Sequence, residues 1–313
     1  MIPAVPDIQT YDIIVIGAGP AGLTAGLYAG RGGLRAAVVE KMAPGGLVAN
    51  TERIDNYPGF PEGISGFDLA QKMQAQAAKF GAQFISDEAQ TIAIEPKSFL
   101  VTLASKIMIK AKAMVIATGA FPRALGVPGE KELLGKGVSY CAVCDGAFFK
   151  GQDVAVVGGG DSAVQEAIYL AGLCSKVTVV HRRSALRAAE SLQRIAFKNV
   201  NISFAWNKTA TAITGTKQVE GLRVMDKETI KEEVLPMSGV FIYVGHTPSS
   251  AIVRDLVKCD EQGYVITDEN MMTSVPGIFA AGDVRKKLVR QISAAVGDAA
   301  TAAIAAQQYI ENL

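Results

Sequence analysis

Tyr11-Asp12-Ile13-Ile14-Val15-Ile16-Gly17-Ala18-Gly19-Pro20-Ala21-Gly22 is the stretch of this chain that decides its fold. The apolar run at its start predicts a buried parallel strand, and a helix is expected over residues 23–30. In such a turn Gly17 permits the tight bend, Gly19 lets the backbone approach a pyrophosphate, and Gly22 allows close packing of helix and strand. The N-terminal end of the helix offers N–H groups and a positive dipole to the phosphates.

The following strand ends in an acidic residue. Residues 36–39 predict a second strand, and Glu40 stands directly after it. A carboxylate about 20 residues past the glycines is placed to accept hydrogen bonds from ribose hydroxyls. Glycine loops alone are weak evidence, but loop, helix, strand and terminal acid together indicate a dinucleotide site.

The same pattern recurs in the second half of the chain. A strand over 153–157 runs into Gly158-Gly159-Gly160-Asp161-Ser162-Ala163, which opens a helix through Leu170. The next strand, 176–180, ends at His181-Arg182-Arg183, with Arg187 further on. An acid there would repel a ribose 2′-phosphate, whereas guanidinium groups bind it with paired hydrogen bonds. The second site therefore suits NADPH, and the first, which ends in Glu40, suits FAD.

Two cysteines stand just ahead of the second loop, in Cys141-Ala142-Val143-Cys144-Asp145. A C-x-x-C pair can close a disulfide that is easily reduced. The other interpretations of such a pair are a zinc site and a purely structural disulfide. The remaining cysteines, Cys174 and Cys259, are isolated, and we expect no metal. A dithiol beside two dinucleotide loops indicates electrons passing from nicotinamide to flavin to disulfide.

Two further strands predict how the chain is divided. Residues 114–120 form a strand and a small-residue turn that closes the first unit, and 240–248 form the return crossing. A third strand and turn follow over 277–283, ending in an acid, and an alanine-rich helix begins near residue 290. We expect an α/β fold of two doubly wound, Rossmann-like nucleotide-binding domains. Residues 1–120 and 249–313 form the discontinuous FAD-binding domain, and the NADPH-binding domain, 123–246, is inserted into it and carries the cysteine pair.

Composition excludes several classes of function. The chain has 313 residues, 49 % of them hydrophobic, and a formal net charge of +1, which argues against a nucleic-acid partner. No apolar run is long enough to span a bilayer, so no membrane association is expected. Residues 1–10 lack the basic start and apolar stretch of a secretion signal. With only four cysteines, a cytoplasmic location is expected.

Together these motifs resemble the low-molecular-weight thioredoxin reductases of bacteria, over nearly the whole chain. The matching segments are Gly17–Gly22, Gly45-Gly46 with Asn56–Gly59, Ala117–Gly119, Cys141–Asp145, Gly158–Ala163, His181–Arg183 with Arg187, Gly282-Asp283 and Arg290-Gln291. The resemblance implies FAD, NADPH, a homodimer and thioredoxin as the protein substrate. In the larger glutathione-reductase type the redox cysteines follow the first glycine motif, where this chain has none.

The resemblance also implies roles for individual residues. Cys144 is the cysteine nearer the flavin, Cys141 attacks thioredoxin, and Asp145 either moves a proton or only caps the helix of the pair. Arg290 either clamps the flavin or reaches the NADPH domain. The FAD contacts would be Gly17, Gly19, Pro20, Ala21, Gly22, Glu40, Gly46, Asn56, Ala117, Thr118, Gly119, Asp283, Arg290 and Gln291. The NADPH contacts would be Gly158, Gly160, Asp161, Ser162, Ala163, His181, Arg182, Arg183 and Arg187.

Some positions depart from the family pattern or leave alternatives open. Leu47 stands where glutamine is usual, Gln165 where a glutamate is frequent, and Ala299 where glycine is common. Phe148 and Phe149 are either part of the thioredoxin contact or a buried core pair. Because disulfide and nicotinamide both have to reach the flavin, we also expect the domains to rotate about the two crossings.

Four other functions compete with this one. A related flavin disulfide reductase could serve a peroxide-reducing partner or a small disulfide, although such a reductase usually carries an extra N-terminal thiol-disulfide domain. An oxygen-using dithiol oxidase should lack the arginines of the second site. A non-catalytic FAD-binding module would not need Cys141, Cys144 and Arg182 together, and an NADPH–ferredoxin reductase would lack the cysteine pair.

Overall fold

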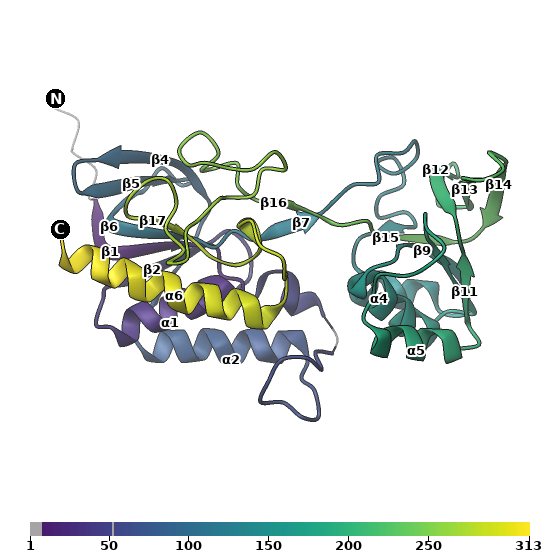
Figure 1. Cartoon of the computed structure of the whole chain (residues 1–313), viewed down its shortest axis with the longest axis horizontal. Coiled ribbons are helices and arrows are strands. Elements are labelled where there is room, and N and C mark those ends of the chain that lie inside the picture. The colour runs from purple at the N-terminus through teal and green to yellow at the C-terminus, as the bar shows by residue number, and fades with distance from the viewer. Residues whose placement is uncertain (1–7, 52) are drawn as a thin grey trace. The chain divides into compact units, whose positions relative to one another are not determined.

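The computed structural model describes residues 8–51 and 53–313. The segment judged to lack a secretion signal lies mostly outside the described residues. The chain divides into two compact units: the first runs up to Phe121 and resumes over Thr247–Leu313, and the second is Pro122–His246. The chain passes between them at strands β7 (Ala120–Pro122) and β16 (His246–Pro248), which pair in a two-stranded sheet (Figure 1).

The first unit is built on a seven-stranded sheet in the order β3-β2-β1-β6-β5-β4, with β17 also paired to β6. Strands β1, β2, β3, β6 and β17 are parallel, whereas β4 and β5 add an antiparallel edge. Its strands are β1 (Gln9–Ile16), β2 (Ala36–Glu40), β3 (Gln83–Ser86), β4 (Ala89–Glu95), β5 (Ser98–Leu103), β6 (Met108–Ile116) and β17 (Ile278–Ala280). Its helices are α1 (Pro20–Arg31), η1 (Gly46–Asn50), α2 (Gly66–Lys79), η3 (Gly282–Val284) and α6 (Ile292–Glu311).

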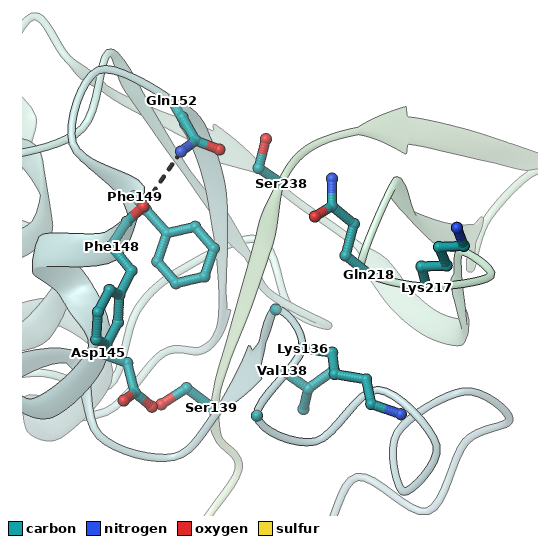
Figure 2. A pocket seen from close by; sticks show the side chains of 12 residues that line it. Lys136, Val138, Ser139, Asp145, Phe148, Phe149, Gln152, Lys217, Gln218 and Ser238 are labelled. Carbon is teal, nitrogen blue, oxygen red and sulfur yellow. Dashed lines mark hydrogen bonds between the residues drawn. The ribbon is translucent and has the colours of Figure 1, made fainter.

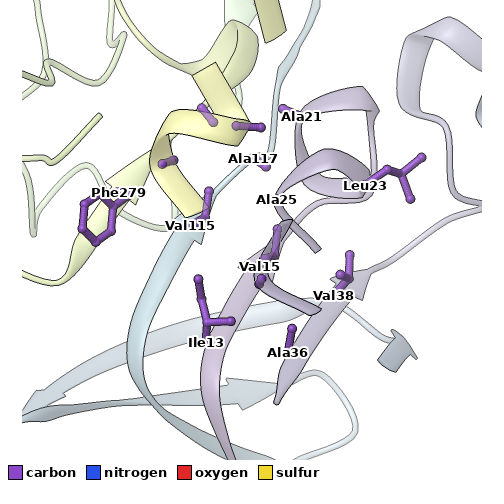
Figure 3. Packing of buried hydrophobic residues seen from close by; sticks show 14 of the residues in the cluster. Ile13, Val15, Ala21, Leu23, Ala25, Ala36, Val38, Val115, Ala117 and Phe279 are labelled. Carbon is purple, nitrogen blue, oxygen red and sulfur yellow. The ribbon is translucent and has the colours of Figure 1, made fainter. Parts of the chain in front are cut away.

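The central strand β1 is buried on both faces, which explains its uninterrupted apolar sequence. Ile13 and Val15 pack with alanines of α1 and α6 on one face (Figure 3). Ile14 and Ile16 pack on the other face in a separate cluster that includes Val253. Because the sheet is covered on both sides, the loops at the ends of its strands are left to form the site.

The second unit contains a parallel five-stranded sheet in the order β11-β10-β9-β15-β8 and an antiparallel three-stranded sheet, β12-β13-β14. The parallel strands are β8 (Val138–Ser139), β9 (Asp153–Gly158), β10 (Lys176–Val180), β11 (Ile202–Ala205) and β15 (Gly239–Tyr243). The antiparallel strands are β12 (Lys208–Thr214), β13 (Gly221–Asp226) and β14 (Glu232–Pro236). The helices are α3 (Ala142–Asp145), η2 (Gly146–Phe149), α4 (Asp161–Ala171) and α5 (Glu190–Lys198).

The predicted fold class is confirmed: both units are α/β with parallel sheets at their centres. Each βαβ element expected from a glycine loop is present, as β1–α1–β2 and β9–α4–β10. The antiparallel sheet β12–β14 was not predicted from the sequence.

Candidate active site

The first glycine loop is closed so tightly that Gly17 and Gly22 have no room for side chains. Gly17 has a φ of 102°, and a Cβ there would lie 2.4 Å from the carbonyl oxygen of Ala117. A Cβ on Gly22 would lie 1.7 Å from the carbonyl oxygen of Gly17. Gly19 caps α1 with extended backbone, and Pro20 begins the helix. The loop therefore presents the N–H groups at the start of α1, the arrangement that receives a pyrophosphate.

Glu40 fastens this loop to the end of β2. Its Oε2 accepts a hydrogen bond from the backbone N–H of Ala18 at 2.7 Å, and its Oε1 accepts one from Met42 at 2.9 Å. On the other side, a Cβ on Gly46 would lie 3.2 Å from the Cα of Gly19. The carboxylate thus shapes the loop, while its predicted contact with ribose stays a prediction.

Two distant segments meet beside the loop. The side-chain amide of Asn56 donates to the amide oxygen of Gln291 at 3.1 Å, and Gln291 caps α6. A Cβ on Gly282 would lie 2.9 Å from the Cβ of Ala21, so the turn that carries Asp283 lies against the start of α1. The structure therefore brings these predicted residues to one end of the sheet.

The strand β6 leads into the segment predicted to contact FAD. The hydroxyl of Thr118 donates to the carbonyl oxygen of Ser249 at 2.7 Å, and the N–H of Ser249 donates to the carbonyl oxygen of Gly119 at 2.9 Å. Arg290 lies over the ring of Tyr264, with 4.2 Å between guanidinium carbon and ring centroid. Its two predicted roles, flavin clamp or contact with the NADPH domain, both stay predictions.

A group of charged side chains behind Asp283 was missed in the sequence. Asp298 on α6 accepts hydrogen bonds from the N–H of Gly282 at 3.1 Å, from Arg285 at 3.0 Å and from Lys287 at 3.1 Å. The ammonium of Lys287 also lies 3.4 Å from a carboxylate oxygen of Asp283. The ion pairs are largely buried, so Asp298 holds the turn that carries Asp283 in place. Only the i,i+4 spacing of Asp283 and Lys287 could have suggested this arrangement.

The second glycine loop repeats the architecture of the first. A Cβ on Gly158 would lie 2.8 Å from the Cβ of Ala163, and Gly160 caps α4 with extended backbone. The carboxylate of Asp161 accepts a hydrogen bond from the N–H of Ala189 at 2.6 Å, which ties the loop after β10 to this turn. The residues predicted to bind phosphate all lie at the N-terminal end of α4: Gly158, Gly160, Asp161, Ser162 and Ala163.

The arginine-bearing segment folds back onto this loop. The N–H of Arg187 donates to the carbonyl oxygen of Gly159 at 2.7 Å. A Cβ on Gly159 would lie 2.4 Å from the ring of His181. Arg182, Arg183 and Arg187 are all exposed, so three cationic groups surround the end of β10. This is the position at which a 2′-phosphate would be recognised.

His181 lies beneath the loop and is only 5 % exposed. Its Nε2 is buried and has no hydrogen-bond partner among the residues that the structure describes. Burial, together with the nearby charges of Arg187, Arg183 and Arg182, lowers the pKa of His181, and the ring is neutral at pH 7.

Cys141 and Cys144 form a disulfide, with 5.3 Å between their Cα atoms. The short helix α3 begins directly after Cys141, whose Sγ accepts a hydrogen bond from the N–H of Cys144 at 3.2 Å. Cys144 is exposed and Cys141 is partly buried. An N–H and a helix N-terminus directed at Cys141 favour a thiolate there once the disulfide is opened.

Two side chains from outside the motif hold its backbone. The hydroxyl of Ser139 accepts a hydrogen bond from the N–H of Cys141 at 2.9 Å, and the hydroxyl of Tyr243 accepts one from the N–H of Ala142 at 2.9 Å. Burial, helped by the negative charges of Glu166 and Asp145, raises the pKa of Tyr243, which stays protonated. Neither contact was predicted. No local pattern connects β15 with the cysteines, whereas Ser139 stands only two residues before Cys141 and its role was missed.

The residue before the motif has a buried partner. The hydroxyl of Tyr140 donates to Glu130 at 2.5 Å, and the same carboxylate accepts hydrogen bonds from the N–H groups of Leu125 at 2.7 Å and Gly126 at 2.6 Å. Glu130 is 3 % exposed. Burial opposes its charge, but these donors outweigh that cost and lower the pKa of Glu130. The loop after the first crossing is thus tied to the redox motif.

A hollow of about 390 Å³ opens beside α3 (Figure 2). Asp145 and Phe148 line one side of it, and Lys217 lies on the opposite side. Phe148 is 76 % exposed, whereas Phe149 packs edge-on against Phe241 with 5.5 Å between ring centroids. Each of the two interpretations therefore applies to one residue: Phe149 belongs to the core, and Phe148 is available to a partner.

The side chain of Asp145 faces this hollow near Ser139 (Figure 2). Its N–H donates to the carbonyl oxygen of Cys141 at 3.2 Å, which closes the turn of α3. The backbone of Asp145 therefore helps to end the helix, while its carboxylate stays available for the predicted proton transfer.

The other two cysteines, Cys174 and Cys259, are free thiols. Burial raises the pKa of Cys174 to about 11, and it also raises the pKa of the partly buried Cys259. Within residues 8–51 and 53–313, no cluster of three or more His, Cys, Asp or Glu side chains could hold a metal ion. In the same residues, no helix has the length and apolar character needed to cross a membrane.

The departures from the family pattern have simple structural settings. Leu47, in η1, is 48 % exposed. Ala299 is fully buried in the cluster between α1 and α6, so a methyl group is accommodated there. Gln165 lies on α4.

Comparison with known proteins agrees with this geometry. The model of the pyridine nucleotide-disulphide oxidoreductase family matches residues 11–299. The thioredoxin reductase of Listeria monocytogenes is 49 % identical over 306 residues, covering 97 % of this chain and 95 % of that protein. That of Bacillus subtilis is also 49 % identical over 306 residues, covering 97 % and 96 %.

Solved structures give the same result. The crystal structure of Lactococcus lactis thioredoxin reductase, in what its description calls the FR conformation, matches with a TM-score of 0.95. It is 42 % identical, and the match covers 97 % of this chain and 100 % of that one. The thioredoxin reductase of T. acidophilum matches with a TM-score of 0.92 at 36 % identity, covering 97 % and 99 %.

The chain therefore belongs to the pyridine nucleotide-disulphide oxidoreductases and, within them, to the thioredoxin reductases. It is a flavoprotein oxidoreductase, and FAD and NADPH, the cofactors expected from the sequence, are those of this family. The two loops fit these groups: in each, glycines allow a tight turn at the N-terminal end of a helix, and the second also has Arg182, Arg183 and Arg187 exposed beside it.

Proposed function

We propose that this protein reduces thioredoxin, passing electrons from NADPH through FAD and the Cys141–Cys144 disulfide. The observation that carries the proposal is that disulfide, which lies at the start of α3 in the unit that also holds the arginine-rich loop. The proposal assigns FAD to the unit containing Glu40 and NADPH to the unit containing Arg182. When bound, nicotinamide and flavin together supply the transfer of an electron pair to the disulfide.

The chemistry of the cysteines follows from thiol–disulfide exchange. Two electrons and two protons convert the Cys141–Cys144 disulfide into a dithiol. The thiolate of Cys141 attacks the disulfide of thioredoxin, so that one partner sulfur is joined to Cys141 and the other leaves and is protonated. The thiolate of Cys144 then attacks Cys141, which restores the disulfide and releases reduced thioredoxin. The N–H of Cys144, directed at the Cys141 sulfur, supports Cys141 as the attacking thiolate.

The exposed ring of Phe148 supports a protein substrate. It stands four residues after Cys144 and beside the hollow lined by Asp145. An exposed aromatic ring next to a reactive disulfide is the kind of residue that anchors a protein partner. Asp145 is the proposed proton donor and acceptor for the thiols.

We also propose a homodimer and a cytoplasmic location. The dimer is supported by the family resemblance. Sedimentation of the purified protein tests the dimer, and fractionation of cells that express it tests the location.

The decisive experiment is NADPH-driven reduction of a cognate thioredoxin, with Cys144→Ser and Cys141→Ser as variants. We expect both variants to lose thioredoxin turnover and to keep NADPH-dependent bleaching of the flavin absorbance, because hydride transfer to flavin needs no thiol. Cys174→Ser is the matched control and should keep full turnover. Turnover near wild type in either motif variant would show that electrons leave by another route.

A further inference from the structure

The only tryptophan of the chain stands at the edge of the second nucleotide site. Trp206 directly follows β11, and the parallel register of β10 and β11 pairs Val180 with Ala205. The residues that follow these two strands, His181 and Trp206, therefore lie side by side, with 6.4 Å between their ring centroids. The N–H of Lys208 donates to the carbonyl oxygen of His181 at 3.1 Å and fixes the chain on the far side of Trp206.

The indole of Trp206 is supported from behind. Phe204 stacks on it with 4.9 Å between centroids and 4° between planes. Phe197 of α5 continues the aromatic group, 5.0 Å from Phe204. One face of the indole is thus covered by Phe204, and Trp206 as a whole stays partly exposed. Trp206 also packs against the buried apolar cluster of the second unit, so the indole is held in place and a second aromatic group would stack on the part of the ring that stays exposed.

The arginines beside Trp206 define what that group would be. Ligands of doubly wound sheets bind outside the carboxyl ends of the strands, where both His181 and Trp206 stand. Arg182 and Arg183 are exposed at this end and suit a 2′-phosphate. In NADPH that phosphate is carried by the ribose to which adenine is attached, so the base has to lie within one sugar of the arginines.

We propose that Trp206 is a binding residue for NADPH, on which the adenine ring stacks while Arg182 and Arg183 hold the 2′-phosphate. This inference rests on the proposed use of NADPH by the second unit and adds the residue that positions the base. The imidazole of His181 adjoins both the indole and Gly159 of the glycine loop, and its buried Nε2 has no hydrogen-bond partner among the described residues. Base–aromatic stacking of this kind tolerates other bases, so Trp206 adds affinity and the arginines add selectivity.

The experiment uses adenosine 2′,5′-bisphosphate, which carries the adenine and the 2′-phosphate but no nicotinamide. Because Trp206 is the single tryptophan, its emission in the FAD-loaded protein reports the site directly. We expect saturable quenching of that emission by the bisphosphate, with the same Kd that calorimetry gives. Trp206→Ala should raise the calorimetric Kd about tenfold, and Trp206→Phe should raise it less because a stacking ring remains. Phe197→Ala, which changes the same aromatic group away from the ligand, is the matched control and should leave the Kd unchanged.

Two results separate this inference from the proposed function. If the bisphosphate binds the wild type but does not change the emission, and Trp206→Ala binds it equally well, the stacking role is wrong and NADPH use stands. If neither the bisphosphate nor NADPH binds the wild type, both proposals are wrong. Circular dichroism shows whether each variant is folded, and Trp206→Phe keeps the test valid should Trp206→Ala fail to fold.

Discussion

Removing the Tyr140 hydroxyl should loosen the connection between the first crossing and the redox motif. In Tyr140→Phe the carboxylate of Glu130 loses the hydrogen bond from the Tyr140 hydroxyl and stays buried. A hydrogen bond to a charged group contributes about 1.5–3 kcal/mol, which is the expected loss in free energy of unfolding of the second unit. In Glu130→Gln, either orientation of the amide places its NH₂ against the N–H of Leu125 or Gly126. An orphaned buried donor costs about 1–3 kcal/mol.

The single tryptophan makes this measurable for one unit alone. Trp206 lies within Pro122–His246, so urea unfolding followed by its emission reports the unit that holds Glu130. The two single variants and the double variant form a cycle, and we expect a coupling energy of about 1–2 kcal/mol. A coupling below about 0.5 kcal/mol would refute the view that Tyr140 and Glu130 stabilise the structure through each other. Ser175→Ala, which removes an exposed hydroxyl that donates to the carbonyl oxygen of Gly151, is a control that should not couple to Glu130.

The same carboxylate predicts a pH dependence. Because the pKa of Glu130 in the folded protein lies below its ordinary value of 4.5, its stabilisation is complete above that value. It is lost as the pH falls through the lowered, folded-state pKa. The difference in unfolding free energy between the wild type and Glu130→Gln should therefore be full at pH 7 and shrink in acid below about 4.5. A difference that grew as the pH fell would contradict this assignment.

Three further predictions concern the cofactor sites and the two units. Gly22→Ala should yield protein that does not retain FAD, because the added Cβ would lie 1.7 Å from the carbonyl oxygen of Gly17. Flavin absorbance of the purified protein measures this. Gly297→Ala is the control: its added Cβ meets nothing within 4 Å, and the protein should keep its flavin absorbance. Arg182→Ala with Arg183→Ala should lower kcat/KM for NADPH by one to two decades and leave that for NADH nearly unchanged; equal wild-type values for the two cofactors would defeat the assignment. A cross-link that locks the two units together should stop thioredoxin turnover and spare one half-reaction, and full turnover in the locked enzyme would exclude domain rotation.

The fold was predictable because its decisive signals are local. A buried strand, a glycine turn and a helix are contiguous, and the physical demands at Gly17 and Gly22 follow from the path of the backbone. Part of the support of the redox motif is not local. Tyr243 reaches the N–H of Ala142 from 101 residues away, and only the order of strands in the sheet brings them together.

Glu40 shows a different kind of difference between sequence and structure. The acid was predicted from its distance to the glycines, and it lies at the expected end of β2. Its two oxygens, however, accept hydrogen bonds from the backbone of Ala18 and Met42. Every residue type except proline has a backbone N–H, so a hydrogen bond to one leaves no mark in the sequence. The sequence therefore cannot distinguish a carboxylate that binds its own loop from one that binds a ribose.

The contrast between the two loops explains how one architecture can suit two cofactors. In the first, the acid at the end of β2 closes the loop itself, through the N–H of Ala18. In the second loop, no acid stands at the corresponding place after β10. Two other hydrogen bonds close this loop: the carboxylate of Asp161 accepts from the N–H of Ala189, and the N–H of Arg187 donates to the carbonyl oxygen of Gly159. Because backbone groups and one aspartate do the closing there, the arginine side chains are not used to hold the loop. They can therefore be exposed at the position where a 2′-phosphate has to be met, and the choice of cofactor is made without altering the glycine turn.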